Sequence, residues 1–170
     1  MKPYVVCFLL LLFSSSSQAL DTAEAYRLIP HKQTPFYLSK SNLPSNEASY
    51  VEKLLSLSER AMVERVEAMM EGPRKSNYAR DIDRILLDLS NLKTPTKLKP
   101  AYQHIVTAIE QHRSYFALSG SSSKSKKQQL VKSSSRHLIA AYNVLMKLYP
   151  QESRHNKQAF FDYLCALDFI

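Results

Sequence analysis

The chain contains very little glycine and very little cysteine, 2 residues of each among 170. So few glycines argue against glycine-rich phosphate-binding loops and against an architecture of tight β-hairpins. Two cysteines exclude a disulfide-stapled scaffold and a zinc site made of four thiolates. The remaining composition, 45% apolar and 22% charged, is that of an ordinary globular protein.

The first 19 residues have the pattern of an export signal. A lysine near the start is followed by an apolar core, residues 4–13, and then by small polar residues. Ser17 and Ala19 occupy the −3 and −1 positions of a cut before Leu20. A membrane span needs about 20 apolar residues, so this core is too short to stay as an anchor. We therefore expect a cleaved signal peptide and a soluble mature protein.

The compartment is suggested by two further absences. Removal of residues 1–19 leaves a single cysteine, Cys165, which cannot form an internal disulfide bond. The chain also lacks any Asn-x-Ser/Thr glycosylation sequon. These features favour a protein that is periplasmic or secreted from a bacterium.

Apolar residues recur at spacings of 3 and 4 along most of the remaining chain, which predicts an all-α fold. Residues 20–45 contain three prolines, and we expect them to form an extended N-terminal strap that Phe36, Tyr37 and Leu38 attach to the bundle. Residues 46–170 are expected to form a single-domain helical bundle of four to five helices. The predicted helices are 46–71, 77–92, 100–118, 128–149 and 153–170.

The fourth predicted helix, 128–149, is apolar around most of its circumference. In its last 12 residues only Asn143 and Lys147 are polar. A helix of this kind is normally buried by several neighbours, so we expect it at the centre of the bundle. The core residues that this position predicts are Leu138, Ala141 and Leu145.

The histidines do not follow a metal-binding pattern. His104 and His112 share a predicted helix but are eight residues apart, about 12 Å along its axis, which is too far for one ion. None of the short histidine motifs of zinc proteases, di-iron bundles or c-type haem proteins occurs. We therefore expect no metal site and no cofactor, with the histidines at the surface or at the edges of apolar stripes.

The acidic residues of the first predicted helix do not suggest catalysis. Glu64, Glu67 and Glu71 share a face, but Arg60 and Arg65 lie nearby and no apolar residues cover them. Catalytic carboxyl groups need a pocket that perturbs their pKa, whereas this pattern is typical of a solvated face.

The remaining thiol does not suggest catalysis either. Cys165 lies among apolar residues and nothing nearby lowers its pKa, which is typical of a buried structural thiol. With no catalytic residues recognisable, we do not expect an enzyme.

The clearest functional signal is a stretch without acidic residues. No Asp or Glu occurs between Gln111 and Gln151, while this stretch contains seven Lys and Arg residues. Much of the charge lies in a serine- and lysine-rich segment, 119–135, which predicts a mobile, solvated loop. Such a loop either keeps the protein soluble or docks an anionic partner. The candidate contacts are Lys124, Lys126, Lys127, Lys132 and Arg136.

The sequence thus favours an exported, non-enzymatic protein that binds an anionic envelope component or an acidic protein surface. Nucleic acid is not an expected partner, because export separates the protein from it. The alternative is a small-ligand or haem carrier with a cavity beside the central helix. Its ligands would come from Tyr102, His104, His112, His137 and Met146.

Overall fold

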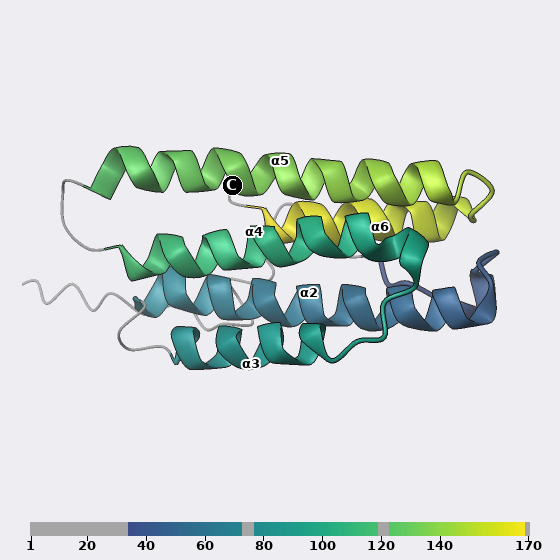
Figure 1. Cartoon of the computed structure of the whole chain (residues 1–170), viewed down its shortest axis with the longest axis horizontal. Coiled ribbons are helices and arrows are strands. Elements are labelled where there is room, and N and C mark those ends of the chain that lie inside the picture. Colours follow the sequence, from purple (N-terminus) through teal and green to yellow (C-terminus); the bar gives the residue numbers. More distant parts are fainter. Residues whose placement is uncertain (1–33, 73–76, 119–122, 169–170) are drawn as a thin grey trace, which may run out of the picture.

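The computed structural model describes residues 34–72, 77–118 and 123–168, and within these ranges it contains five α-helices and no strand (Figure 1). The predicted all-α helical bundle is therefore confirmed. The predicted signal peptide, 1–19, and residues 20–33 of the strap lie outside the described residues. The helices are α2 (Ser45–Glu71), α3 (Tyr78–Ser90), α4 (Lys99–Ala117), α5 (Lys124–Leu148) and α6 (Arg154–Leu167), with the short 3-10 helices η1 (Leu38–Lys40) and η2 (Thr96–Leu98).

Proline, glycine and serine define several of the helix ends. α2 ends at Gly72, whose φ of 85° is a conformation that residues with a side chain rarely adopt. Pro100 lies in the first turn of α4, where its missing N–H costs no hydrogen bond. The Ser153 side chain caps α6 by accepting a hydrogen bond from the backbone N–H of Asn156 at 3.2 Å.

The helices are arranged around α2 and α4. α2 contacts α3, α4 and α6, whereas α5 packs mainly on α4 and α6. Figure 1 accordingly shows α5 along one side of the bundle and α3 along the opposite side. The prediction that the helix near 128–149 is central is therefore wrong.

The prediction of a central helix failed because many apolar residues of α5 are not fully buried. Only four of its side chains are buried, and Ile139 remains 59% exposed. Val144 and Met146 are half-buried against the core. The buried residues form one narrow stripe at spacings of 3 and 4, so α5 needs only one covered face. The buried residues of α5 are Ser134, Leu138, Ala141 and Leu145. The predicted core residues Leu138, Ala141 and Leu145 are therefore confirmed.

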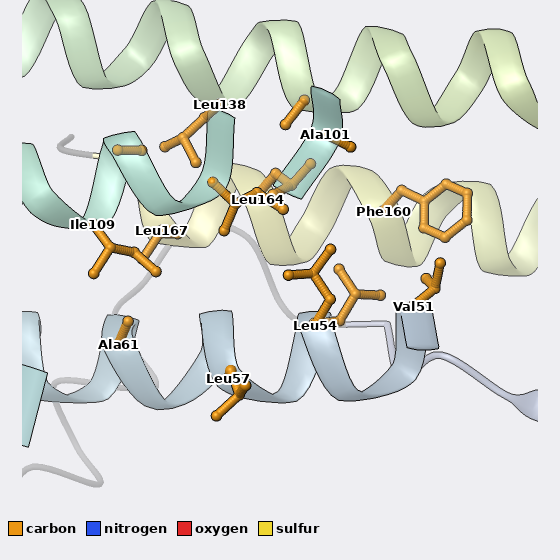
Figure 2. Packing of buried hydrophobic residues seen from close by; sticks show 14 of the residues in the cluster. Val51, Leu54, Leu57, Ala61, Ala101, Ile109, Leu138, Phe160, Leu164 and Leu167 are labelled. Carbon is orange, nitrogen blue, oxygen red and sulfur yellow. The ribbon is translucent and has the colours of Figure 1, made fainter. Parts of the chain in front are cut away.

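One continuous apolar core joins the helices. Figure 2 shows side chains of α2, α4, α5 and α6 converging in the space between these helices. Burial of this apolar surface is the main favourable contribution to folding, at about 25 cal/mol per Å². The labelled residues are Val51, Leu54, Leu57, Ala61, Ala101, Ile109, Leu138, Phe160, Leu164 and Leu167.

Residues 34–43 lie along α6 and are bound to it by polar side chains that are themselves buried. Asn156 donates from its amide nitrogen to the carbonyl oxygen of Tyr37, and its amide oxygen accepts from the Tyr37 N–H, both at 3.0 Å. The Phe36 ring stacks on Phe160 with the centroids 5.9 Å apart. The described part of the predicted strap is thus held by the apolar contact of Phe36 and by the hydrogen bonds of the Tyr37 backbone.

Two buried carboxylates bind the two ends of the segment 34–43. Asp162 accepts hydrogen bonds from the backbone N–H and the hydroxyl of Thr34. Glu152 accepts from the Ser41 hydroxyl at 2.7 Å and from the Asn42 N–H at 3.1 Å. Burial by itself raises the pKa of Glu152, but the hydrogen bonds to its carboxylate outweigh burial and lower the pKa overall.

The position of Leu145 generates a first prediction. Leu145→Ala should lower the free energy of unfolding by about 2–5 kcal/mol, because it removes buried atoms and leaves a cavity. Asn143→Ala, on the exposed face of the same helix, should be nearly neutral. Urea denaturation of both variants measures this difference. Similar losses in the two variants would contradict the orientation of α5.

Asn156 generates a second prediction. Asn156→Ala removes both hydrogen bonds to Tyr37 and should cost about 1–3 kcal/mol. Amide hydrogen exchange at Tyr37 should become faster. Arg154→Ala, at an exposed position of the same helix, is the control and should leave this exchange unchanged. Unaltered exchange in Asn156→Ala would show that the side chain does not hold this segment.

Candidate functional site

The predicted basic loop is largely helical. Among its described residues, Ser123 precedes α5, and α5 begins at Lys124, four residues before the predicted start at Gln128. Residues 119–122 lie outside the described part of the chain. The serines and the charge indicated a loop, but lysine and glutamine favour helices, and no proline or glycine occurs between Lys124 and Leu148. The four predicted contact lysines therefore lie in helix α5, which fixes the direction of each.

A groove lies where the end of α4 meets the start of α5. Tyr115 comes from the last turns of α4, and the remaining lining residues come from Ser123 and from one face of α5 at spacings of 3 and 4. The ammonium nitrogen of Lys127 lies 5.0 Å from the centroid of the Tyr115 ring, a cation–π contact. The lining residues are Tyr115, Ser123, Lys124, Lys127, Gln128, Val131 and Lys132.

The electrostatic environment of this groove is positive. α5 contains no Asp or Glu along its whole length, so no carboxylate on this helix neutralises the lysines. The lysines also lie near the amino end of α5, where the helix dipole is positive and disfavours cations by a few tenths of a kcal/mol each. A bound anionic group would relieve both effects.

The groove contains three of the five predicted contact residues. Lys124, Lys127 and Lys132 line it. Lys126 is exposed on the opposite face of α5, and Arg136 is exposed one turn beyond Lys132. The sequence analysis missed Tyr115, which lies in α4 and comes near the lysines only through packing between helices.

A second candidate, a serine–histidine pair, is buried in the bundle. Ser134 of α5 and His112 of α4 lie 2.6 Å apart, Oγ to Nε2. His112 is only 1% exposed and Ser134 is fully buried, so a substrate cannot reach this pair. Burial, with a smaller effect of Arg65, lowers the pKa of His112 to about 3. The pair is a neutral structural contact between α4 and α5.

The prediction that His112 lies at the surface or a stripe edge is therefore wrong. His112 continues the spacing of 3 and 4 set by Ile105 and Ile109, which could have placed it in the core. Arg65, predicted on a solvated face, is also buried and is 3% exposed. Its guanidinium donates to the carbonyl oxygen of Ala166 at 2.9 Å, which joins α2 to α6.

A third feature is a pair of half-buried histidines between α4 and α5. The Nδ1 atoms of His104 and His137 lie 2.9 Å apart. Within the described ranges, no group of three or more His, Cys, Asp or Glu side chains could hold a metal ion.

The Cys165 thiol and the Glu64 carboxylate, both considered above, have raised pKa values. Cys165 is half-buried beside a small apolar hollow between α5 and α6, and burial, with Asp168, raises the pKa of its thiol. Glu64 is also half-buried, and burial raises its pKa with a smaller effect from Glu67. A raised pKa makes the thiol a poorer nucleophile.

Comparisons with known proteins do not extend this description. The chain matches no protein-family model, and neither the curated proteins nor the solved structures contain a significant match. Of the helices in the described ranges, none combines the length and the apolar character that crossing a membrane requires.

The burial of His112 generates a third prediction. Because its pKa is lowered from 6.5 to about 3 in the folded protein, the unfolded chain binds the proton more readily. The neutral, buried His112 therefore contributes fully to the free energy of unfolding above pH 6.5. As the pH falls from 6.5 towards 3, the free energy of unfolding decreases by up to about 1.4 kcal/mol per pH unit. His112→Gln should give a shallower decline in this range, measured by urea denaturation at several pH values. Equal slopes would contradict the neutral, buried state of His112.

Proposed function

We propose that this chain is an exported, non-enzymatic binding protein whose basic groove between α4 and α5 docks an acidic segment of a partner protein. The observation that carries the proposal is the convergence of Lys124, Lys127 and Lys132 with Tyr115 in one groove. Surface lysines scattered for solubility would have no reason to line a single hollow beside an aromatic ring. The absence of acidic residues along α5 leaves this charge available to a partner.

The shape and chemistry of the groove favour a polypeptide over other anionic partners. A bilayer surface is broad and would reach only the rim of a hollow. A polysaccharide would match the lysines but would gain little from Val131, whose side chain lines the same groove. An acidic segment that also carries apolar side chains matches both kinds of lining residue.

Export is the second part of the proposal. It is supported by the pattern of residues 1–19, a basic start, a short apolar core and small residues before Leu20. A periplasmic or secreted protein meets envelope components and other exported proteins. Cytoplasmic nucleic acid is then not a partner, although the groove is basic.

The alternative, a small-ligand or haem carrier, has less support. Of its five candidate ligands, His112 is buried and hydrogen-bonded to Ser134. Tyr102 and Met146 are both half-buried against the core. A Soret band in the absorbance spectrum of the purified protein would favour this carrier over the binding protein.

Charge reversal in the groove is our fourth prediction. A fluorescent peptide of mixed Glu and Leu residues should bind the wild-type protein at low salt and more weakly at physiological salt, where charges are screened beyond about 8 Å. The variant Lys124→Glu/Lys127→Glu should weaken binding by about tenfold or more, because like charges then face each other. Its stability should be preserved, because glutamates suit the amino end of a helix.

A matched control lies on the same helix. Lys126→Glu/Lys147→Glu makes the same change in net charge at exposed positions outside the groove, so it should retain most of the affinity. An equal loss of peptide affinity in the two variants would mean that the total positive charge of α5, and not the groove, attracts the peptide. Stronger binding to anionic vesicles or to a polyuronate than to the peptide would identify a different class of partner and overturn this one.

A further inference from the structure

His104 and His137 face each other across the contact between α4 and α5. Their Nδ1 atoms are 2.9 Å apart, and their ring centroids are 5.2 Å apart with an angle of 42° between the planes. At this distance one ring donates its Nδ1–H to the Nδ1 of the other ring. Both residues are half-buried, so each keeps some contact with solvent, through which an ion and its water molecules can approach.

The spacing of the two rings matches that of two imidazoles on one metal ion. Nitrogen ligands about 2.1 Å from a tetrahedral ion are about 3.4 Å apart, and their ring centroids are then about 5 Å apart. The observed centroids already have this separation. Small rotations of the rings would widen the Nδ1 distance and direct both lone pairs to one point.

We propose that His104 and His137 form a two-histidine site for a divalent transition-metal ion, Ni²⁺ or Zn²⁺ in type, that bridges α4 and α5. Water completes the coordination, since the described residues provide no group of three ligands. Imidazole nitrogen suits these ions, whereas Mg²⁺ and Ca²⁺ prefer carboxylate oxygens, and α5 has none.

A metal ion binds the neutral form of each ring through its Nδ1 lone pair, and the pair brings the two Nδ1 atoms together. Burial, and to a smaller extent His137, lowers the pKa of His104, which favours the neutral ring that a metal requires. On binding, the ring that donates its Nδ1–H releases this proton to water and takes one up on Nε2. The acceptor ring already carries its proton on Nε2, so both rings are neutral when both Nδ1 atoms face the ion. No redox change is involved.

The site is separate from the basic groove. His104 and Tyr115 are eleven residues apart in α4, about 16 Å along the helix axis. On α5 the nearest lining residue, Lys132, is five residues from His137, about 7.5 Å along the axis. A metal ion at the histidines therefore does not contact the groove lysines. The two proposals rest on different residues and fail independently.

Titration of the untagged, full chain with Ni²⁺ by calorimetry tests this site and gives our fifth prediction. The wild-type protein should bind Ni²⁺ at neutral pH and should not bind Mg²⁺ at the same concentration. His104→Gln and His137→Gln should each weaken Ni²⁺ binding by about tenfold or more, because a single imidazole loses the benefit of a second, preplaced ligand. His155→Gln, which alters a histidine in contact with Pro35 and Tyr37, is the control and should bind like the wild type.

Two measurements on the wild-type chain test the metal site without any substitution. Ni²⁺ should raise the midpoint of urea denaturation, because only the folded chain brings the two rings together. Both the binding and this shift should disappear at acidic pH, where imidazoles are protonated. Equal Ni²⁺ binding by the wild type and the His104→Gln/His137→Gln double variant would overturn the proposal, as would an equal loss in His155→Gln.

Discussion

Helix α6 carries Asn156 and Asp162 in buried positions, and Glu152 is buried just before its start; the hydrogen bonds that residues 34–42 supply make this possible. A buried polar group without a partner costs about 1–3 kcal/mol, so this face of α6 would be unstable if it were bare. The same contacts place Phe36 against Phe160, which closes the core on that side. One segment therefore satisfies the polar groups of α6 and covers its apolar ones.

The same requirement links the other helices. Arg65 joins α2 to the end of α6 through the carbonyl oxygen of Ala166, and His112 joins α4 to α5 through Ser134. The contact between His112 and Ser134 fixes the orientation of α5, because a rotation of that helix would separate the two side chains. With one face committed to α4 and α6, α5 presents its lysines outward at the edge of the bundle. The position of the groove thus depends on polar contacts in the core.

The seam between α4 and α5 carries both features to which we assign binding. At one end the lysines and Tyr115 form the groove, and further along α4 His104 meets His137. Each combines residues from two helices, so neither is visible in any single segment of the sequence. A single basic stretch indicated the lysines, but the helix selects three of the five. Lys126 and Arg136 have the same charge, but Lys126 lies on the opposite face of α5 and Arg136 lies one turn beyond the groove.

The spacing of apolar residues was enough to predict an all-α bundle, most helix boundaries and the core positions Leu138, Ala141 and Leu145, because a helix buries residues at intervals of 3 and 4. The same spacing could not decide which helix is central, since the amount of apolar surface does not specify how many neighbours cover it. The chemical type of the side chains led to the predictions that Arg65 lies on a solvated face and His112 at the surface or at the edge of an apolar stripe, and both are buried. Their burial depends on Ala166 and Ser134, which are 101 and 22 residues distant in the sequence. Only the tertiary structure brings such partners within hydrogen-bonding distance, and burial of a polar group becomes favourable only when its partner is present.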